Sequence, residues 1–176
     1  LSGITDNVHH TGNTIIDSLL IISKQVSDFS IDGVDLTRKK LILATVHRRE
    51  NWGENLNQIA IALKDIVNAN QDTFLLFPMH RNPIIRKCLY EILGSHPRIK
   101  LSEPLDYDQL VSAIKKSTLV LTDSGGLQEE APAFGKPVLV LRNTTERQEA
   151  IDSGTSKLVG TSKDYVFSAT NLLLNN

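Results

Sequence analysis

Two consecutive glycines follow a short apolar run in the second half of the chain, in the order Ser124-Gly125-Gly126. Glycine lets the backbone approach a ligand closely, and the helix that follows presents free N–H groups at the positive end of its dipole. A phosphate or diphosphate suits such a turn, but paired glycines also form tight strand-to-helix turns that bind nothing. The turn is neither a Walker loop nor Gly-x-Gly-x-x-Gly, which disfavours nicotinamide and flavin dinucleotides.

A histidine and two arginines directly follow an earlier apolar run. His47, Arg48 and Arg49 come at the point where a buried strand would end. A histidine beside cations at the end of a strand suits an active site, although a lone histidine is also common as a structural residue. The arginines can contact a phosphate, or one of them can pair with Glu50 or Glu54. These residue types favour an anionic ligand without excluding a purely structural cluster.

Charged residues also begin two helices that we predict beyond the glycine turn. Glu129 and Glu130 lie in the first turns of one helix, where carboxylates favour the helix dipole. They are either simple dipole partners, or one of them faces the ligand and accepts hydrogen bonds from ribose hydroxyls. Arg147 lies near the start of the other helix, where a cation opposes the dipole. That conflict indicates anion binding, unless exposure to solvent relieves it.

Six short apolar runs would position these residues along one edge of a sheet. Most lack polar alternation, as strands buried on both faces do, and helical segments separate them. Alternating strands and helices predict a doubly wound, Rossmann-like α/β fold with a parallel sheet, in which ligands bind beyond the carboxyl ends of the strands. The six runs are Leu41–Val46, Thr73–Phe77, Arg98–Leu101, Thr118–Leu121, Pro137–Leu141 and Lys157–Val159.

Start and stop signals mark several of the helices. Asn82 before Pro83 predicts the cap of a helix over 83–93. Asp106 with a glutamine three residues later resembles a capping box. A further helix is expected to begin near Gly126 and to end at Gly135, ahead of a proline.

Composition excludes several kinds of partner. The chain has 176 residues with 19 basic and 20 acidic side chains, a net charge of −1, so no long-range field attracts nucleic acid or a membrane surface. No apolar run is long enough for a membrane span and no secretory signal opens the chain, so we expect a cytoplasmic protein. Cys88 is the only cysteine, and no histidine and carboxylate cluster has metal-ligand spacing. We therefore expect no metal and no cofactor.

The chain length fits one domain preceded by a short segment. Residues 1–29 are expected to form an interdomain junction and a helix, and residues 30–176 a Rossmann-like domain. The helix is either a connector to another domain or an element packed on this one. Because the chain opens with Leu1 rather than methionine, we expect an N-terminal portion to precede it in the parent protein.

Several motifs resemble those of the bacterial non-hydrolysing UDP-N-acetylglucosamine 2-epimerases. The resemblance extends over nearly the whole chain, and the two longest motifs carry it most specifically. The motifs are Thr11–Asp17, His47–Asn51, Pro78–Pro83, Asp123–Pro132 and Gly135–Ala150.

The resemblance implies the second domain of a two-domain enzyme with the glycosyltransferase-B fold, whose active site lies between the domains. By motif position, Ser124, Gly125 and Gly126 would donate to the diphosphate of UDP, Glu130 would accept from the ribose hydroxyls, and Arg147 would contact phosphate. Arg48 would join this UDP site. His47 matches the active-site histidine, and His80 matches a position near a regulatory UDP-sugar site. Leu105 replaces a polar residue near the uracil, for which the surroundings of Leu110 would form an apolar wall.

The family's reaction interconverts UDP-N-acetylglucosamine and UDP-N-acetylmannosamine by eliminating UDP and adding it back after proton exchange at C2 of the sugar. The carboxylates assigned to proton transfer belong to the family's first domain, and no matching segment occurs here. The resemblance thus implies that the chain alone does not complete the reaction. It also implies a UDP-sugar substrate and a homodimeric full-length protein.

Three other interpretations remain open from the sequence. A glycosyltransferase with the same two-domain architecture would use the same nucleotide-binding half. A stand-alone nucleotide-sugar-binding module would require the chain to be a complete natural product. A generic Rossmann-like domain would have no affinity for nucleotides, and the polar residues at its sheet edge would be coincidental.

Overall fold

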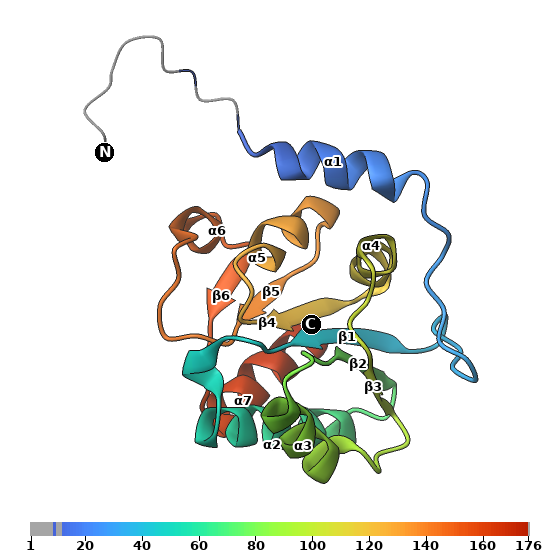
Figure 1. The fold of residues 1–176 in the computed structure, drawn as a ribbon, viewed down its shortest axis with the longest axis vertical. Coiled ribbons are helices and arrows are strands. Elements are labelled where there is room, and N and C mark those ends of the chain that lie inside the picture. The colour runs from blue at the N-terminus through green and yellow to red at the C-terminus, as the bar shows by residue number, and fades with distance from the viewer. Residues whose placement is uncertain (1–8, 10–11, 176) are drawn as a thin grey trace.

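A computed structural model describes residue 9 and residues 12–175 of the chain (Figure 1). Six parallel strands form one sheet in the order β3-β2-β1-β4-β5-β6. Each strand overlaps a predicted apolar run, so the predicted doubly wound α/β fold is confirmed. The strands are β1 (Lys40–Thr45), β2 (Thr73–Pro78), β3 (Ile99–Ser102), β4 (Leu119–Thr122), β5 (Val138–Val140) and β6 (Ser156–Leu158).

Helices cover both faces of the sheet, as Figure 1 shows. One face packs against α2 (Glu54–Ala69), α3 (Pro83–Leu93) and α7 (Lys163–Leu174). The other face packs against α4 (Tyr107–Lys116) and α5 (Leu127–Glu130). The core is therefore split by the sheet into two apolar layers, and the strands between them are buried on both sides. The remaining elements are α1 (Thr14–Ser23), α6 (Gln148–Asp152) and the 3₁₀ turns η1 (Arg49–Asn51) and η2 (Pro132–Phe134).

The predicted helix starts are confirmed by their hydrogen bonds. The side chain of Asn82 accepts from the N–H of Ile84 at 2.9 Å, which caps α3 directly ahead of Pro83. At the start of α4, the side chain of Gln109 accepts from the N–H of Asp106 at 3.2 Å. Both bonds supply partners to backbone groups that a helix leaves unpaired at its first turn.

The predicted helix from Gly126 to Gly135 is wrong in its length. α5 ends at Glu130, and the chain continues as the 3₁₀ turn η2 from Pro132 to Phe134. Proline has no N–H, so Pro132 cannot continue the ladder of helical hydrogen bonds. Gly135 then ends the turn in the left-handed conformation at a φ of 67°, which glycine adopts without steric cost.

The first helix lies over α4 and α5 on the outside of the domain (Figure 1). Leu19 is fully buried there, and the Nζ of Lys115 donates to the carbonyl of Ser23 at 2.7 Å. α1 is thus packed on this domain, whatever else it connects to. Thr11 of the junction motif lies outside the described residues, and the division at residue 30 stays a prediction. No helix among residues 12–175 is long and apolar enough to cross a membrane.

Candidate functional site

A cavity of about 410 Å³ opens at the carboxyl ends of β1, β2 and β4. The strand order reverses between β1 and β4, and this switch point is where open α/β sheets bind ligands. Its polar lining includes His47, His80, Ser124, Gly126 and Glu130, which the sequence predicted as site residues. Its apolar lining includes Val46, Met79, Leu105, Leu110 and Leu127.

A larger cavity of about 930 Å³ lies between the segment that follows α1 and the start of α4. It shares Leu105 and Tyr107 with the cavity at the strand ends. We place the candidate site in the smaller cavity, because the two histidines, the glycine turn and Glu130 line it. None of these residues lines the larger cavity.

The glycine turn is held from both sides. The N–H of Ser124 donates to the hydroxyl of Thr122 at 2.9 Å, and the side chain of Gln128 donates to the carbonyl of Ser124 at 3.1 Å. The carbonyl oxygen of Gln128's own side chain accepts from the hydroxyl of Thr145 at 2.6 Å. This fully buried glutamine therefore ties the turn to the loop after β5.

A buried carboxylate organises the loop that carries His47. Asp123 is fully buried, and its oxygens accept from the N–H groups of His47 at 3.1 Å and Arg48 at 2.8 Å. They also accept from the side-chain amide of Asn51 at 2.9 Å, which donates again to the carbonyl of Leu141 at 3.0 Å. Burial alone would raise the pKa of Asp123, but the hydrogen bonds from His47, Arg48 and Asn51 outweigh it and hold the pKa below its ordinary value.

The two histidines of the cavity lie side by side. The Nδ1 of His47 is 3.1 Å from Oδ1 of Asp123, and its ring is stacked on His80 with the ring centroids 6.5 Å apart. His80 is exposed, and its Nδ1 accepts from the N–H of Asn82 at 3.1 Å. His47 was predicted for the active site and His80 for a regulatory site, but both histidines line the same cavity.

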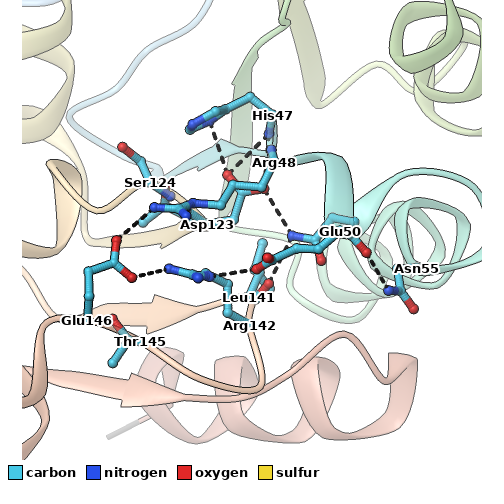
Figure 2. A network of polar contacts seen from close by, with 12 residues as sticks. His47, Arg48, Glu50, Asn55, Asp123, Ser124, Leu141, Arg142, Thr145 and Glu146 are labelled. Atoms are coloured by element: carbon cyan, nitrogen blue, oxygen red, sulfur yellow. Dashed lines mark hydrogen bonds and ion pairs between the residues drawn. The ribbon is translucent and has the colours of Figure 1, made fainter.

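Arginines and glutamates alternate in a chain beside the glycine turn (Figure 2). Arg48 pairs with Glu146 at 2.8 Å, Glu146 pairs with Arg142 at 2.6 Å, and Arg142 pairs with Glu50 at 2.7 Å. A Cβ atom on Gly125 would be 2.9 Å from Oε1 of Glu146, so a larger residue there would have to displace this carboxylate. The hydrogen bond from Arg142, together with the nearby charge of Arg48, lowers the pKa of Glu146 to about 2.

The partners in this chain differ from those that the sequence predicted. We expected Arg48 or Arg49 to pair with Glu50 or Glu54 if it did not contact a ligand, but Arg48 pairs with Glu146. The partner of Glu50 is Arg142, from the end of β5. The strand order brings the loop after β1 next to the loop after β5. Residues that are close together in the sequence do not indicate this contact.

Arg147 and Glu130 have different surroundings beside the glycine turn. Arg147 is the N-cap residue of α6, as predicted, and its guanidinium forms an ion pair with Glu129. Glu130 faces the cavity instead, and the hydroxyl of Tyr107 lies 3.3 Å from its Oε1. Burial is the main cause that raises the pKa of the Glu130 carboxyl above its usual range. One glutamate is thus a charge partner and the other faces the cavity.

The sequence reasoning missed four residues that hold the site together. They are polar residues, and for all but Gln128 at least one partner lies 72 to 98 residues away in the sequence. All four lie inside motifs of the family resemblance, and for Asp123 and Gln128 the position beside the glycine pair was a further signal. The four are Asn51, Asp123, Gln128 and Glu146.

Fold and site together define a class of protein, a Rossmann-like α/β domain of the glycosyltransferase-B type. The family model described as UDP-N-acetylglucosamine 2-epimerase matches residues 2–176. The UDP-N-acetylglucosamine 2-epimerase of Escherichia coli K12 is 42% identical over 174 residues, which are 94% of this chain and 46% of that protein.

Two solved structures are similar over almost the whole chain. The S. aureus MnaA–UDP co-structure is 44% identical with a TM-score of 0.91, covering 99% of this chain and 48% of that one. The Neisseria meningitidis UDP-GlcNAc 2-epimerase bound to UDP-GlcNAc is 39% identical with a TM-score of 0.89, covering 96% and 47%. The chain belongs to the UDP-N-acetylglucosamine 2-epimerase family. It spans about half the length of the curated relatives it matches.

Replacing Asn51 by alanine should destabilise the domain. The substitution removes the donor that bridges the Asp123 carboxylate and the carbonyl of Leu141, both of which are buried. We expect the free energy of unfolding, measured by urea denaturation at neutral pH, to fall by about 1–3 kcal/mol. The matched control is Asn175→Ala at an exposed position. An equal, small effect of both substitutions would contradict the bridging role.

The contribution of Glu146 should disappear in acid. Its pKa is lowered from 4.5 to about 2, so its stabilising effect is present above about pH 4.5 and is lost as the pH falls toward 2. The difference in unfolding free energy between the wild type and Glu146→Gln should therefore shrink over that window. Glu149→Gln, at an exposed position of α6, is the control and should show no such trend. A difference that stays constant between pH 5 and pH 2.5 would refute the ion pairing.

Proposed function

We propose that the chain is the UDP-binding half of a UDP-N-acetylglucosamine 2-epimerase. The parent enzyme interconverts UDP-N-acetylglucosamine and UDP-N-acetylmannosamine by eliminating UDP and adding it back. Residues 30–176 form the UDP-binding domain, and residues 1–29 form the junction with the other half. The observation that carries the proposal is one cavity that combines His47, the glycine turn and Glu130, in a chain of this family.

Each side of the cavity suits one part of UDP. The backbone of Ser124, Gly125 and Gly126 receives the diphosphate, because the glycines allow close approach and α5 begins there. Glu130 accepts from the ribose hydroxyls, since its carboxylate is buried at the cavity wall. Leu105 and Leu110 then provide an apolar wall for the uracil.

The basic residues around the turn complete the anion site. Arg147 is paired with Glu129 of α5, and Arg48 is paired with Glu146. A diphosphate competes with these carboxylates for the two guanidinium groups, which form strong paired hydrogen bonds to phosphate. His47 lines the same cavity as the glycine turn, which supports our assignment of the bond between sugar and diphosphate to this wall.

This arrangement fits the proposed reaction. Elimination leaves negative charge on the departing diphosphate, and preorganised N–H groups and cations stabilise that charge. Holding UDP in the cavity also keeps the return step effectively intramolecular. Proton transfer at C2 of the sugar requires carboxylates from the other half of the enzyme, so the isolated chain does not turn the substrate over. A homodimeric parent protein and a regulatory UDP-sugar site near His80 stay predictions.

Isothermal titration with UDP tests the site. We expect saturable binding by the wild-type chain, and we expect Arg147→Ala to weaken it by about 1–3 kcal/mol, because a charged partner of the phosphate is lost. Ser124→Ala should weaken it by about 0.5–1.5 kcal/mol at most, since the backbone N–H groups remain.

Arg38→Ala is the control for the loss of a positive charge, because its side chain is 86% exposed and lies outside the cavity. It should bind UDP as the wild type does. No saturable binding by the folded wild-type chain, with or without the matching half of a relative such as the E. coli enzyme, would contradict the proposal.

Hydrogen exchange at C2 of the sugar tests the division of labour. In D₂O, the isolated chain should leave the C2 hydrogen of UDP-N-acetylglucosamine in place, as followed by proton NMR. The chain mixed with the other half of a relative should replace that hydrogen with deuterium. Exchange catalysed by the isolated chain would show that it carries its own proton-transfer groups and would overturn this part of the proposal.

A further inference from the structure

The side chain of His47 is fixed by the buried carboxylate of Asp123. Oδ1 of Asp123 lies 3.1 Å from both the backbone N–H and the ring Nδ1 of His47. Oδ2 accepts from the N–H of Arg48 at 2.8 Å and from Asn51 at 2.9 Å. The carboxylate accepts from three N–H groups, which shows that Asp123 acts as an acceptor. Its contact with Nδ1 therefore requires a proton on that ring nitrogen.

That constraint determines which nitrogen faces the ligand. A neutral imidazole carries one proton, so with Nδ1–H bound to Asp123 the lone pair lies on Nε2. The His47 side chain is 43% exposed and lines the candidate cavity. In the neutral ring, Nε2 is therefore a hydrogen-bond acceptor, which repels phosphate oxygens. With a second proton it becomes a donor, and the ring becomes a cation next to a buried carboxylate.

The charges around His47 favour that second proton once a diphosphate enters. Asp123 faces the ring from the end of β4, and its lowered pKa keeps it ionised. His80 stacks on the ring from the loop after β2. Arg48, the next residue, is paired with Glu146, and Glu130 lines the same cavity. A bound diphosphate adds negative charge next to the ring, which the ring can meet with a hydrogen bond only when Nε2 is protonated.

We propose that Asp123 is a positioning residue that holds His47 as the Nδ1–H tautomer, and that Nε2 takes up one proton from solvent when a nucleoside diphosphate binds. The inference rests on the proposed UDP site. No covalent bond is made or broken, and the proton returns to solvent when UDP leaves. UDP binding is thereby coupled to pH, and the affinity for UDP is expected to fall as the pH rises.

The first experiment reads the tautomer directly in the free chain. Nitrogen NMR of the protein labelled with ¹⁵N-histidine distinguishes a protonated from an unprotonated ring nitrogen. We expect Nδ1 of His47 to carry the proton and Nε2 to be unprotonated at high pH. A predominant Nε2–H tautomer in the wild type overturns the inference, whether or not the chain binds UDP.

The second experiment measures protons taken up with UDP. Titrations in buffers of different ionisation enthalpy at about pH 8, where the phosphates of UDP are fully ionised because their second pKa is about 6, should show uptake of up to one proton. His47→Asn should abolish the uptake. His96→Asn should retain it, because His96 lies before β3, at the amino ends of the strands, and outside the cavity.

Asp123→Asn tests the positioning role, because the amide removes the charge that balances an imidazolium. A folded variant should bind UDP with less proton uptake and a flatter pH profile, whereas a merely structural role would weaken binding equally at every pH. If this variant does not fold, the two wild-type measurements still decide the question. UDP binding without proton uptake overturns the inference and leaves the proposed function standing. No UDP binding at any pH contradicts the proposed function, while the tautomer measurement still tests Asp123.

Discussion

The buried carboxylate of Asp123 is the interaction on which the candidate site depends. It has no access to water, so each of its oxygens needs donors from the protein. Those donors are the backbone of His47 and Arg48 and the amide of Asn51, all of them on the loop after β1. The loop can close only in the conformation that meets this requirement, and that conformation places the His47 ring at the cavity. The buried carboxylate after β4 thereby fixes the loop after β1, and the position of this loop determines the shape of the site.

Local pairing explains how a chain with a net charge of −1 can offer an anion site. Each guanidinium near the glycine turn is paired with a carboxylate of the same chain: Arg48 with Glu146, and Arg147 with Glu129. An anionic ligand therefore exchanges partners rather than entering a field of free cations. Such an exchange favours ligands that offer two closely spaced anionic groups over single anions, because two guanidinium groups must be compensated at once.

The strands, the helix caps and the glycine turn could be predicted because each depends on residues close together in the sequence. Apolar runs without alternation indicate buried parallel strands, and Asn82 before Pro83 indicates a cap. The length of α5 was also predictable, since Pro132 has no N–H to continue the helical hydrogen bonds. The partners of Arg48 and Asp123 were not, because they lie 98 and 76 residues away in the sequence. Only the strand order selects such partners among the many carboxylates and donors of the chain.

The strand order also has a consequence for biosynthesis. β1 lies between β2, which follows it closely in the chain, and β4, which is made only after β2 and β3. On the ribosome, β1 can pair with β2 early, while its other edge waits for β4 with its backbone groups unpaired. Unpaired strand edges are where chains associate wrongly. The pairing of β1 with β4, at whose carboxyl ends the ligand site lies, thus forms only after β2 and β3 have been made, and a nascent chain remains open to misassembly there until residues 119–122 have emerged.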